Sequence, residues 1–312
     1  MFRLCNTTKI FTVNTKYLHA IIINTEHKKE EITMLDMKYC ELSKDGFGCC
    51  MTVKETLFSG QSEFQKVDIF DTESMGRVLT LDGLMMTTER DEFFYHEMIS
   101  HIPMMSHKKP ESVLVIGGGD GGTIREVLKH ETVKNVVLCE IDGMVVDACK
   151  KYLPTIACGL DDPKVEVKVE DAIEFIKDKK AQYDIILIDS TDPMGPGEGL
   201  FTEEFYTNVK EALKEGGIMA AQSESPFINQ AEMKKMYPLL RKVFPIVDTF
   251  TGPIPSYPGG YWSWCFCSET VRPFDFIDEE RAEKITKLCK IYNKEYHLAS
   301  FALPNFVKEL TK

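Results

Sequence analysis

The sequence of 312 residues lacks a basic surplus, a long apolar run and a paired-cysteine motif, and each absence disfavours a class of protein. Its 37 lysines and arginines stand against 49 aspartates and glutamates, giving a net charge of −12, whereas a general nucleic-acid binder needs a basic face. No apolar run approaches the roughly 20 residues of a membrane-spanning helix. We therefore expect neither a nucleic-acid partner nor a membrane partner.

The cysteines and histidines do not form a recognisable metal motif. The ten cysteines are scattered without a C-x-x-C pair, which in a chain of this length predicts reduced, mostly buried thiols in a cytoplasmic protein. The segment "HEMISH" (96–101) is one residue too long for the zinc motif H-E-x-x-H. His96 and His101 should therefore not share a helix face, and we expect no metal site.

The N-terminal segment differs from the rest of the chain. Residues 1–25 contain Arg3, Lys9 and Lys16 but no acidic residue, which weakly resembles a transit sequence. The apolar stretch Ala20–Ile23 is too short for the apolar part of a secretion signal. We interpret residues 1–33 as an extension outside the core, or as the result of an upstream start codon, with the working chain beginning near Met34.

The pattern of residues 34–95 predicts a small N-terminal β domain. The runs "MTVKETLFSG", "QKVDIFDT" and "GRVLTLDG" are short and are broken by Gly, Ser and Asp, as is typical of an antiparallel meander. The segment 91–105 then predicts a helix whose first turn is acidic. We assign residues 96–312 to a second domain, and the polar connector 106–112 marks the seam.

After the connector, strands and helices alternate. Strands are predicted at 113–116, 136–140, 165–169, 184–189 and 217–222. Helices are predicted at 123–130, 142–151, 171–180, 202–214 and 229–243. This alternation predicts an α/β, Rossmann-like fold with a mostly parallel sheet and helices on both faces. Ligands of such sheets bind at the carboxyl ends of the strands.

The loop "GGGDGG" (117–122) follows the first of these strands. Gly117, Gly119 and Gly122 have the G-x-G-x-x-G spacing of a dinucleotide site, but Asp120 lies between them. Two like unit charges about 4 Å apart repel by roughly 4 kcal/mol at an effective dielectric constant near 20. The loop therefore favours an adenosyl sulfonium or an ammonium over a pyrophosphate.

The other predicted strands also end in acidic residues, namely Glu140, Asp171, Asp189 with Asp192, and Glu224 after Gln222. Such a cluster of negative charge in one crevice indicates a cationic ligand. Local alternatives remain, because Glu140 has the spacing of a ribose-binding acid, Asp171 has the position of a helix cap, and Asp192 precedes a proline in a turn. Asp189 directly follows the apolar run "IILI", where an unpaired charge is costly.

The segments "GGGDGG", "CEID", "EDA", "DSTDPMGP" and "PSYPGG", together with the upstream "YHEM", resemble the spermidine synthases, the polyamine aminopropyltransferase family. The resemblance runs from about residue 48 to residue 310. It implies a β-meander domain on a Rossmann-like, methyltransferase-type domain, assembled as a homodimer or homotetramer. The implied reaction moves the aminopropyl group of decarboxylated S-adenosylmethionine to putrescine, giving spermidine and 5'-methylthioadenosine. No cofactor is implied, because the donor is a co-substrate.

The resemblance also implies roles for individual residues. The donor would be bound by Gln65, Asp120, Glu140, Asp171, Ala172 and Pro196. The polyamine would be bound by Tyr95, His96, Asp120, Asp189, Ser190, Thr191, Asp192 and Tyr257, with Asp189 as the catalytic base. The alternative for Tyr95 and Tyr257 is packing in the core. The Gly- and Pro-rich segment 190–200 suits a lid.

Other functions remain open on the sequence. Met86 stands where some family members carry a glutamine facing the acceptor, so agmatine or cadaverine is an alternative to putrescine. A diamine N-methyltransferase would use intact S-adenosylmethionine, whose carboxylate would meet Asp120. A non-catalytic polyamine or nucleoside sensor would not need Asp189 as a proton acceptor. A dehydrogenase is disfavoured by the same Asp120.

Overall fold

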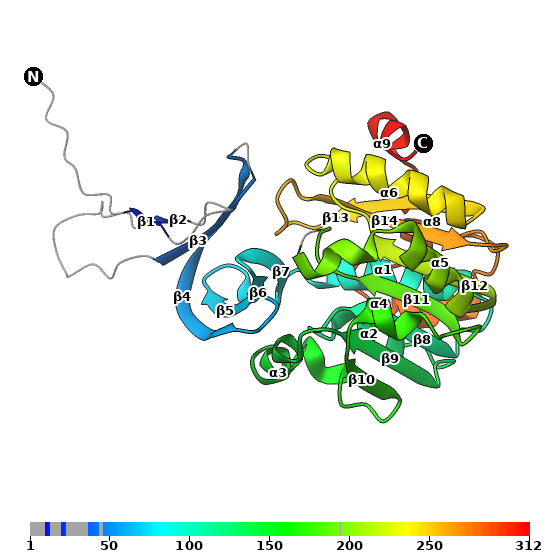
Figure 1. The fold of residues 1–312 in the computed structure, drawn as a ribbon, viewed down its shortest axis with the longest axis horizontal. Helices are drawn as coiled ribbons and strands as arrows, with labels where there is room; N and C mark the ends of the chain where they lie inside the picture. Colours follow the sequence, from blue (N-terminus) through cyan, green and yellow to red (C-terminus); the bar gives the residue numbers. More distant parts are fainter. Residues whose placement is uncertain (1–9, 13–19, 23–36, 44–45, 194) are drawn as a thin grey trace, which may run out of the picture.

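A computed structural model describes residues 10–12, 20–22, 37–43, 46–193 and 195–312. The N-terminal part forms an antiparallel sheet in the order β3-β4-β5-β6-β7 (Figure 1). Its strands are β3 (Met37–Leu42), β4 (Gly48–Gln61), β5 (Lys66–Thr72), β6 (Gly76–Leu81) and β7 (Leu84–Thr88). The predicted meander is therefore confirmed. Short strands β1 (Ile10–Thr12) and β2 (Ala20–Ile22) pair with each other. The rest of the predicted extension lies outside the described residues.

The larger sheet has the order β10-β9-β8-β11-β12-β14-β13. Its strands are β8 (Ser112–Gly117), β9 (Asn135–Glu140), β10 (Val165–Val169), β11 (Tyr183–Asp189), β12 (Leu213–Gln222), β13 (Ile246–Pro253) and β14 (Tyr261–Ser268). The first five in spatial order run parallel, and β14 and β13 complete the sheet with antiparallel pairing. The predicted α/β, Rossmann-like fold is confirmed.

Helices cover both faces of this sheet (Figure 1). They are α1 (Phe93–Ser106), α2 (Gly122–Leu128), α3 (Gly143–Tyr152), α4 (Ala172–Ile176), α5 (Glu203–Ala212), α6 (Gln230–Val243), α7 (Glu279–Thr286), α8 (Lys294–Ser300) and α9 (Asn305–Leu310), with 3-10 turns η1 (Ala157–Gly159) and η2 (Gly195–Leu200). Along β8, Val113 and Val115 pack with α1 to α3, whereas Leu114 and Ile116 pack with α4 to α6. This alternation follows from the two-residue period of a strand.

Helix α1 is the central element between the two sheets. Residues 95–106 are all buried, and their core cluster includes Val67 and Leu79 of the N-terminal sheet. The helix begins at Phe93, so Asp91 and Glu92 precede it, and the prediction that they form its first turn is wrong. Their carboxylates make tertiary contacts instead, since Asp91 accepts hydrogen bonds from Thr88 and Ser256. Helix α1 spans the predicted domain boundary at 95/96, which stays a prediction.

Three predicted helix ends were wrong, and the first is that of α2, which ends at Leu128 rather than at residue 130. Helix α4 ends at Ile176 rather than at residue 180, because residues 177–180 are all charged and bring no apolar surface for the sheet to cover. Helix α5 ends at Ala212, because Leu213 already pairs with Tyr183 as part of β12. Strands β13 and β14 and helices α7 to α9 had no counterpart in the sequence prediction.

The expectation that the cysteines are free thiols is wrong for one pair. Cys40 of β3 and Cys50 of β4 form a disulfide with their Cα atoms 4.1 Å apart. The cause is the register of the hairpin, which places these two residues directly opposite each other. Four of the remaining described cysteines are buried and free, namely Cys139, Cys149, Cys265 and Cys267.

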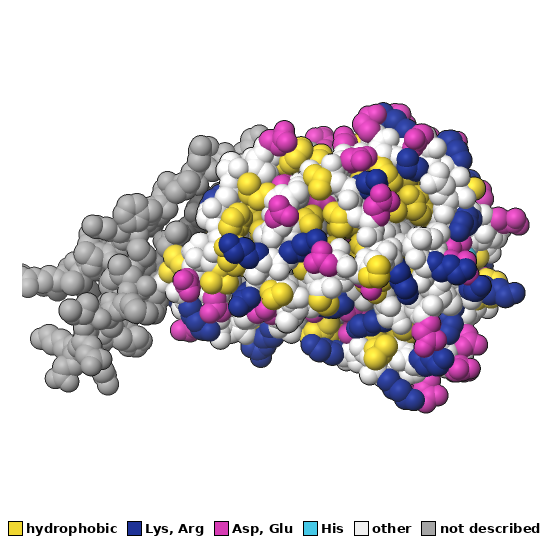
Figure 2. All heavy atoms as spheres, turned by 90° about the horizontal axis from the view of Figure 1, so that it is seen from below, with side chains coloured by type: hydrophobic (Ala, Val, Ile, Leu, Met, Phe, Trp, Pro, Cys, Tyr) yellow, Lys and Arg dark blue, Asp and Glu magenta, His cyan; other side chains and the backbone are white. Residues whose placement is uncertain are grey.

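The surface carries charges of both signs. On the face in Figure 2, lysines and arginines alternate with aspartates and glutamates and do not gather into one basic tract. Within the described ranges, no helix combines the length and the hydropathy needed to cross a bilayer.

Candidate active site

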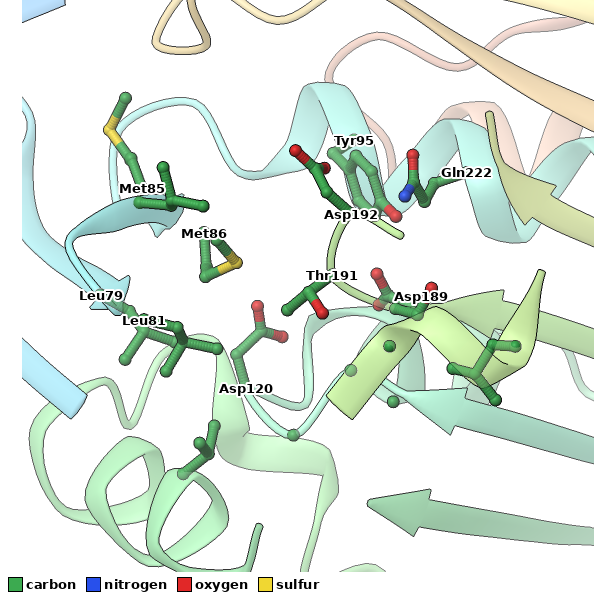
Figure 3. A pocket seen from close by; sticks show the side chains of 18 of the residues that line it. Leu79, Leu81, Met85, Met86, Tyr95, Asp120, Asp189, Thr191, Asp192 and Gln222 are labelled. Carbon is green, nitrogen blue, oxygen red and sulfur yellow. The ribbon is translucent and has the colours of Figure 1, made fainter. Parts of the chain in front are cut away.

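A cavity of about 400 Å³ lies between the N-terminal sheet and the carboxyl ends of the parallel strands. Its walls differ in chemistry (Figure 3). Leu79, Leu81, Met85 and Met86 of β6 and β7 line one side, and the opposite side carries acidic residues from the strand ends, Asp120, Asp189 and Asp192. Such a cavity suits a ligand with ammonium groups on an apolar chain.

Most residues predicted for the site line this cavity. They are Gln65, Tyr95, His96, Asp120, Glu140, Asp171, Ala172, Asp189, Ser190, Thr191, Asp192 and Tyr257. Pro196 lies within η2, but its side chain is outside the described part of the chain. The individual roles expected for these residues stay predictions.

The glycine loop makes room for two functional side chains. Gly117, Gly118 and Gly121 have φ values of 74°, 68° and 83°, which favour glycine. A Cβ on Gly118 would lie 2.7 Å from Asp189 Oδ2, and a Cβ on Gly122 would lie 2.2 Å from the His96 ring. The loop is thus shaped around the site's own acidic and imidazole groups.

Asp120 is fixed by its own loop. The backbone N–H of Gly122 donates to Asp120 Oδ1 at 2.7 Å, while Oδ2 lies 3.4 Å from His96 Nε2. The Asp120 side chain is 11% exposed. Its negative charge therefore faces the cavity with little water to screen it.

Glu140 ends β9 beside this loop. Its carboxylate accepts hydrogen bonds from the N–H groups of Gly119 at 3.2 Å and Asp142 at 2.9 Å. Burial raises the pKa of Glu140 to about 7. Asp142 also caps α3 and accepts a hydrogen bond of 3.0 Å from Gln65. One capping residue thereby links the N-terminal sheet to the side of the cavity where Glu140 lies.

Asp171 has the capping role that its local sequence allowed. Its Oδ1 accepts from the N–H of Ile173 at 2.8 Å at the start of α4, and it also lines the cavity. One carboxylate oxygen occupied in capping leaves the second available for another donor. The two interpretations of Asp171 are compatible.

Asp189 ends β11 in a partly buried position next to α2. Its Oδ2 accepts a hydrogen bond of 2.6 Å from the Thr123 hydroxyl, and it is also hydrogen-bonded to Tyr95. Burial, followed by the charge of Asp120, raises the pKa of Asp189. A raised pKa makes a carboxylate a better proton acceptor than an exposed one.

A second group of acids lies further along the cavity. Burial raises the pKa of Asp192 to about 6, and burial together with Asp192 raises the pKa of Glu224 well above its usual value. Glu224 Oε2 is buried without a hydrogen-bond partner, and Glu224 has a φ of 73°. Glu232 of α6 lines the same region. This group suits the binding of a second cationic group.

The two tyrosines both pack and line the cavity. The ring centroids of Tyr95 and Tyr257 are 6.3 Å apart, and Tyr95 also packs on Trp264 at 5.6 Å. The Tyr257 hydroxyl donates a hydrogen bond of 2.6 Å to the backbone carbonyl of Met86. Tyr257 therefore holds the strand β7 whose side chains form the apolar wall.

The sequence prediction did not include several residues that the structure places in or next to the site. Glu92 and Arg125 lie behind His96, with distances of 2.6 Å from Glu92 Oε2 to His96 Nδ1 and 2.7 Å from Glu92 Oε2 to Arg125 Nη2. Both belong to segments that looked like ordinary helix surface. Further lining residues were also missed, among them Glu41, Leu42, Ser43, Asn229, Glu232 and Trp262. They come from elements that only the tertiary fold brings to the cavity.

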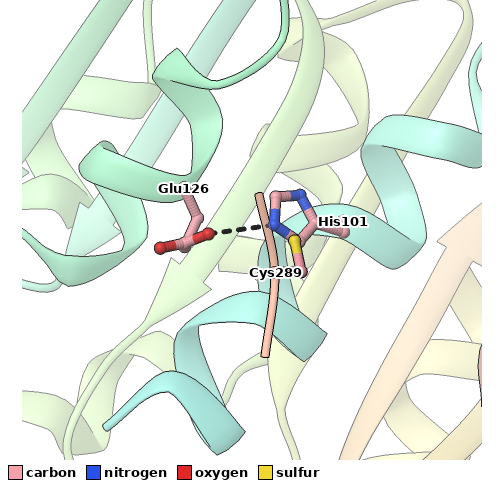
Figure 4. A group of neighbouring side chains, drawn as sticks. All are labelled: His101, Glu126 and Cys289. Atoms are coloured by element: carbon pink, nitrogen blue, oxygen red, sulfur yellow. Dashed lines mark hydrogen bonds and ion pairs between the residues drawn. The ribbon is translucent and has the colours of Figure 1, made fainter. Parts of the chain in front are cut away.

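A separate cluster lies on the far side of α1 and α2. His101, Glu126 and Cys289 have potential ligand atoms within 4.8 Å of one another (Figure 4). However, Glu126 is already paired with His101, with Lys129 and, at 2.9 Å, with Arg125 Nε. His101 Nδ1 lies 3.0 Å from His130 Nε2. The cluster is accordingly a buried ion-pair network whose negative charge is balanced by its own cations.

Comparisons with known proteins agree with this geometry. Residues 37–89 match a family model described as the spermidine synthase tetramerisation domain, and residues 92–278 match the spermine/spermidine synthase domain. The polyamine aminopropyltransferase of Thermotoga neapolitana is 48% identical over 263 residues, covering 84% of this chain and 89% of that protein. The polyamine aminopropyltransferase of Alkaliphilus oremlandii is 46% identical over 278 residues, covering 88% and 98%.

A solved structure is also similar over nearly its whole length. It is a spermidine synthase in complex with the transition-state analogue AdoDATO, and it is 45% identical to this chain with a TM-score of 0.86. The match covers 92% of this chain and 98% of that one. Both domains of the fold are therefore shared with that protein.

Proposed function

The chain belongs to the spermine/spermidine synthase family, and on this premise we propose that it transfers the aminopropyl group of decarboxylated S-adenosylmethionine to putrescine, giving spermidine and 5'-methylthioadenosine. The observation that carries the proposal is Asp120. It faces the cavity from the loop that in a dinucleotide enzyme would hold a phosphate. In this position it attracts the donor's ammonium and repels a phosphate or carboxylate.

The donor would lie across the strand ends. Glu140 and Asp171 would accept hydrogen bonds from the ribose and the adenine amino group, with Gln65, Ala172 and Pro196 alongside. Asp120 would bind the ammonium of the aminopropyl arm. A charge-assisted hydrogen bond of this kind contributes about 1.5–3 kcal/mol.

The acceptor amine must lose a proton before it can attack, because alkylamines are protonated at neutral pH. Asp189 is suited to accept this proton, since it is partly buried, has a raised pKa and is held by Thr123. The donor sulfonium becomes a neutral thioether during transfer. The surrounding carboxylates therefore chiefly bind and align the two substrates.

The rest of the acceptor would lie along the apolar wall. Tyr95, His96, Ser190, Thr191 and Tyr257 would line the channel, and Asp192 would bind the distal ammonium. Met86 offers a thioether instead of an amide at this wall. The four-carbon chain of putrescine needs only apolar contacts there, and cadaverine is the acceptor that the same wall would tolerate next.

Product analysis tests the proposal. Decarboxylated donor is supplied with putrescine, cadaverine, agmatine or spermidine, and the products are identified by mass. Spermidine and methylthioadenosine in equal amounts from putrescine are expected. A preference for another amine would correct the acceptor, and equal turnover of intact S-adenosylmethionine would favour an N-methyltransferase instead. Binding of both ligands without any product would favour a sensor.

We further propose that the enzyme is a homodimer or homotetramer that works in the cytoplasm. The match of residues 37–89 to the tetramerisation-domain model supports the oligomer.

A further inference from the structure

The His96 ring is buried between two carboxylates. Its Nδ1 lies 2.6 Å from Glu92 Oε2, and its Nε2 lies 3.4 Å from Asp120 Oδ2. A neutral imidazole carries one N–H and can donate to only one of these oxygens. Only the doubly protonated ring presents an N–H to each carboxylate, and both distances lie within ion-pair range. The two carboxylates therefore favour His96 as a cation that pairs with Asp120.

The surroundings hold the ring in this position. Arg125 of α2 binds Glu92 at 2.7 Å, and the ring lies where a Gly122 side chain would be. Burial opposes the charge of His96, but Asp120 and Glu92 outweigh it and raise the His96 pKa well above its usual value. The titratable or charged groups around His96 are Glu92 and Tyr95 of the α1 segment, Asp120 of the glycine loop, Arg125 of α2 and Asp189 of β11.

Two ion pairs lie within this group, Glu92 with Arg125 and Asp120 with His96. Asp189 adds a third carboxylate next to them. The donor's ammonium would add a second cation to Asp120 in a site with little screening water. Two cations on one buried carboxylate repel each other. Loss of the proton on His96 Nε2 would relieve this repulsion and would leave the Glu92–Arg125 pair intact.

We propose that His96 is the resident counter-ion of Asp120 and that donor binding displaces its Nε2 proton. The Nε2–H bond breaks, the proton passes to solvent, and the nitrogen lone pair then accepts an N–H of the donor's ammonium. This proposal rests on the proposed function, because the ligand that displaces the proton is decarboxylated S-adenosylmethionine. Glu92 and Arg125 are positioning residues, since they act through His96.

Proton displacement makes donor binding depend on pH. For each whole proton released on binding, the apparent dissociation constant of the donor falls tenfold when the pH rises by one unit. The dependence applies where His96 is protonated in the empty site and neutral in the complex. The product 5'-methylthioadenosine lacks the ammonium and should not displace the proton.

Calorimetry on the full chain counts the protons directly. The donor is titrated into the protein without acceptor, at neutral pH, in buffers of different ionisation enthalpy. The observed binding enthalpy is plotted against the ionisation enthalpy of the buffer, and the slope gives the number of protons released per site. We expect about one proton per site for the donor and none for methylthioadenosine. The methylthioadenosine titration also controls for any proton change at Glu140, since both ligands carry the nucleoside.

Two variants assign the proton to His96. His96→Gln should bind the donor with an enthalpy independent of the buffer, and Glu92→Gln should release a smaller fraction of a proton. Histidine ¹⁵N NMR on the unmodified chain gives the same answer without a variant, because Nε2 of His96 should lose its proton when the donor binds. If either variant fails to fold, this measurement on the unmodified chain still tests the proposal.

The outcomes separate the inference from the function on which it rests. Donor binding with a buffer-independent enthalpy in the unmodified chain overturns the proton displacement and leaves the aminopropyl transfer intact. Release that persists in His96→Gln also overturns it, and assigns the proton to another group such as Asp189. A chain that does not bind the donor at all overturns both.

Discussion

At the scale of single residues, the properties of this site come from carboxylates kept out of water. Asp189, Asp120, Glu140 and Asp192 line one cavity of about 400 Å³. Burial raises the pKa of Asp189, and it raises the pKa values of Asp192 and Glu140 to about 6 and about 7. Each of these groups consequently gains from a positive partner or from a proton. The same property suits them to bind ammonium groups and to accept a proton from one.

The substitution Asp189→Asn tests the proposed base. It keeps the size of the side chain and its hydrogen bond with Thr123, but it removes the proton acceptor. We expect turnover to fall by a factor of about 10² to 10⁴, the usual contribution of general base catalysis, with methylthioadenosine binding retained. Steady-state kinetics and calorimetry measure the two quantities. Thr123→Val is the matched control and should cost less. Unchanged turnover in Asp189→Asn would remove Asp189 from this role.

Gly122→Ala tests the close packing of the glycine loop on His96. The new methyl group would meet the ring at 2.2 Å, and overpacking of a buried site costs about 1–3 kcal/mol. We expect lower unfolding free energy in urea and weaker donor binding. Gly143→Ala is the matched control, because Gly143 also begins a helix but its Cβ would lie 3.3 Å from a Val169 methyl group. Equal behaviour of the two variants would contradict the packing argument.

At the scale of elements, the seam between α1 and α2 is held by buried charge as well as by apolar contacts. Glu92 immediately precedes α1 and binds Arg125 of α2, while Glu126 of α2 binds His101 of α1. Burial opposes the ionisation of Glu92, but the hydrogen bonds and charges of His96 and Arg125 outweigh it and lower the Glu92 pKa to about 2. The local sequence around Glu92 predicted only an acidic helix start.

The stability of this seam should depend on pH. Because the pKa of Glu92 is lower in the folded state than its ordinary 4.5, its contribution is complete above that value and is lost as the pH falls toward 2. We expect Glu92→Gln to lower the free energy of unfolding by about 3 kcal/mol at pH 7 and by about 1 kcal/mol at pH 3. Urea unfolding at both pH values measures this difference. Glu283→Gln, at an exposed ion pair, should change little at either pH. A cost for Glu92→Gln that does not shrink in acid would contradict the ionised seam.

The parallel strands of the larger sheet were predictable from local sequence, whereas its two antiparallel strands were not. Strands β8 to β12 were predicted within a few residues, because their apolar runs are bounded by glycines and acids. The position of Asp171 as both cap and lining residue was also within reach of the local sequence. Strands β13 and β14 were missed, and only the antiparallel pairing of β14 with β12 adds them to the sheet.

At the scale of the whole molecule, the cavity exists because two sheets share one core. Val67, Leu79 and the buried side of α1 belong to the same cluster as the larger sheet. This packing sets the apolar wall of β6 and β7 opposite the acidic strand ends (Figure 3). The N-terminal sheet alone lacks the acidic side of the cavity, and the larger sheet alone lacks the apolar side.

The assembly of whole chains is the remaining prediction at this scale. We expect light scattering after size-exclusion chromatography to give a mass of two or four chains. The expectation rests on the match of the N-terminal sheet to a tetramerisation domain. The measured mass should not change between dilute and concentrated samples. A mass of one chain across the whole concentration range would contradict the assembly.

The sequence by itself determined the fold class and the ends of the parallel strands, and it predicted the class of ligand. These properties are local, because apolar periods, glycine loops and the acids that follow strands are read within one segment, and Asp120 in "GGGDGG" already opposes a phosphate. Only the tertiary structure decided the Cys40–Cys50 disulfide, the apolar wall opposite the acids and the pairing of His96 with both Glu92 and Asp120. Each of these depends on which residues the packing of distant segments or the register of a hairpin brings into contact, and a local pattern does not contain that information.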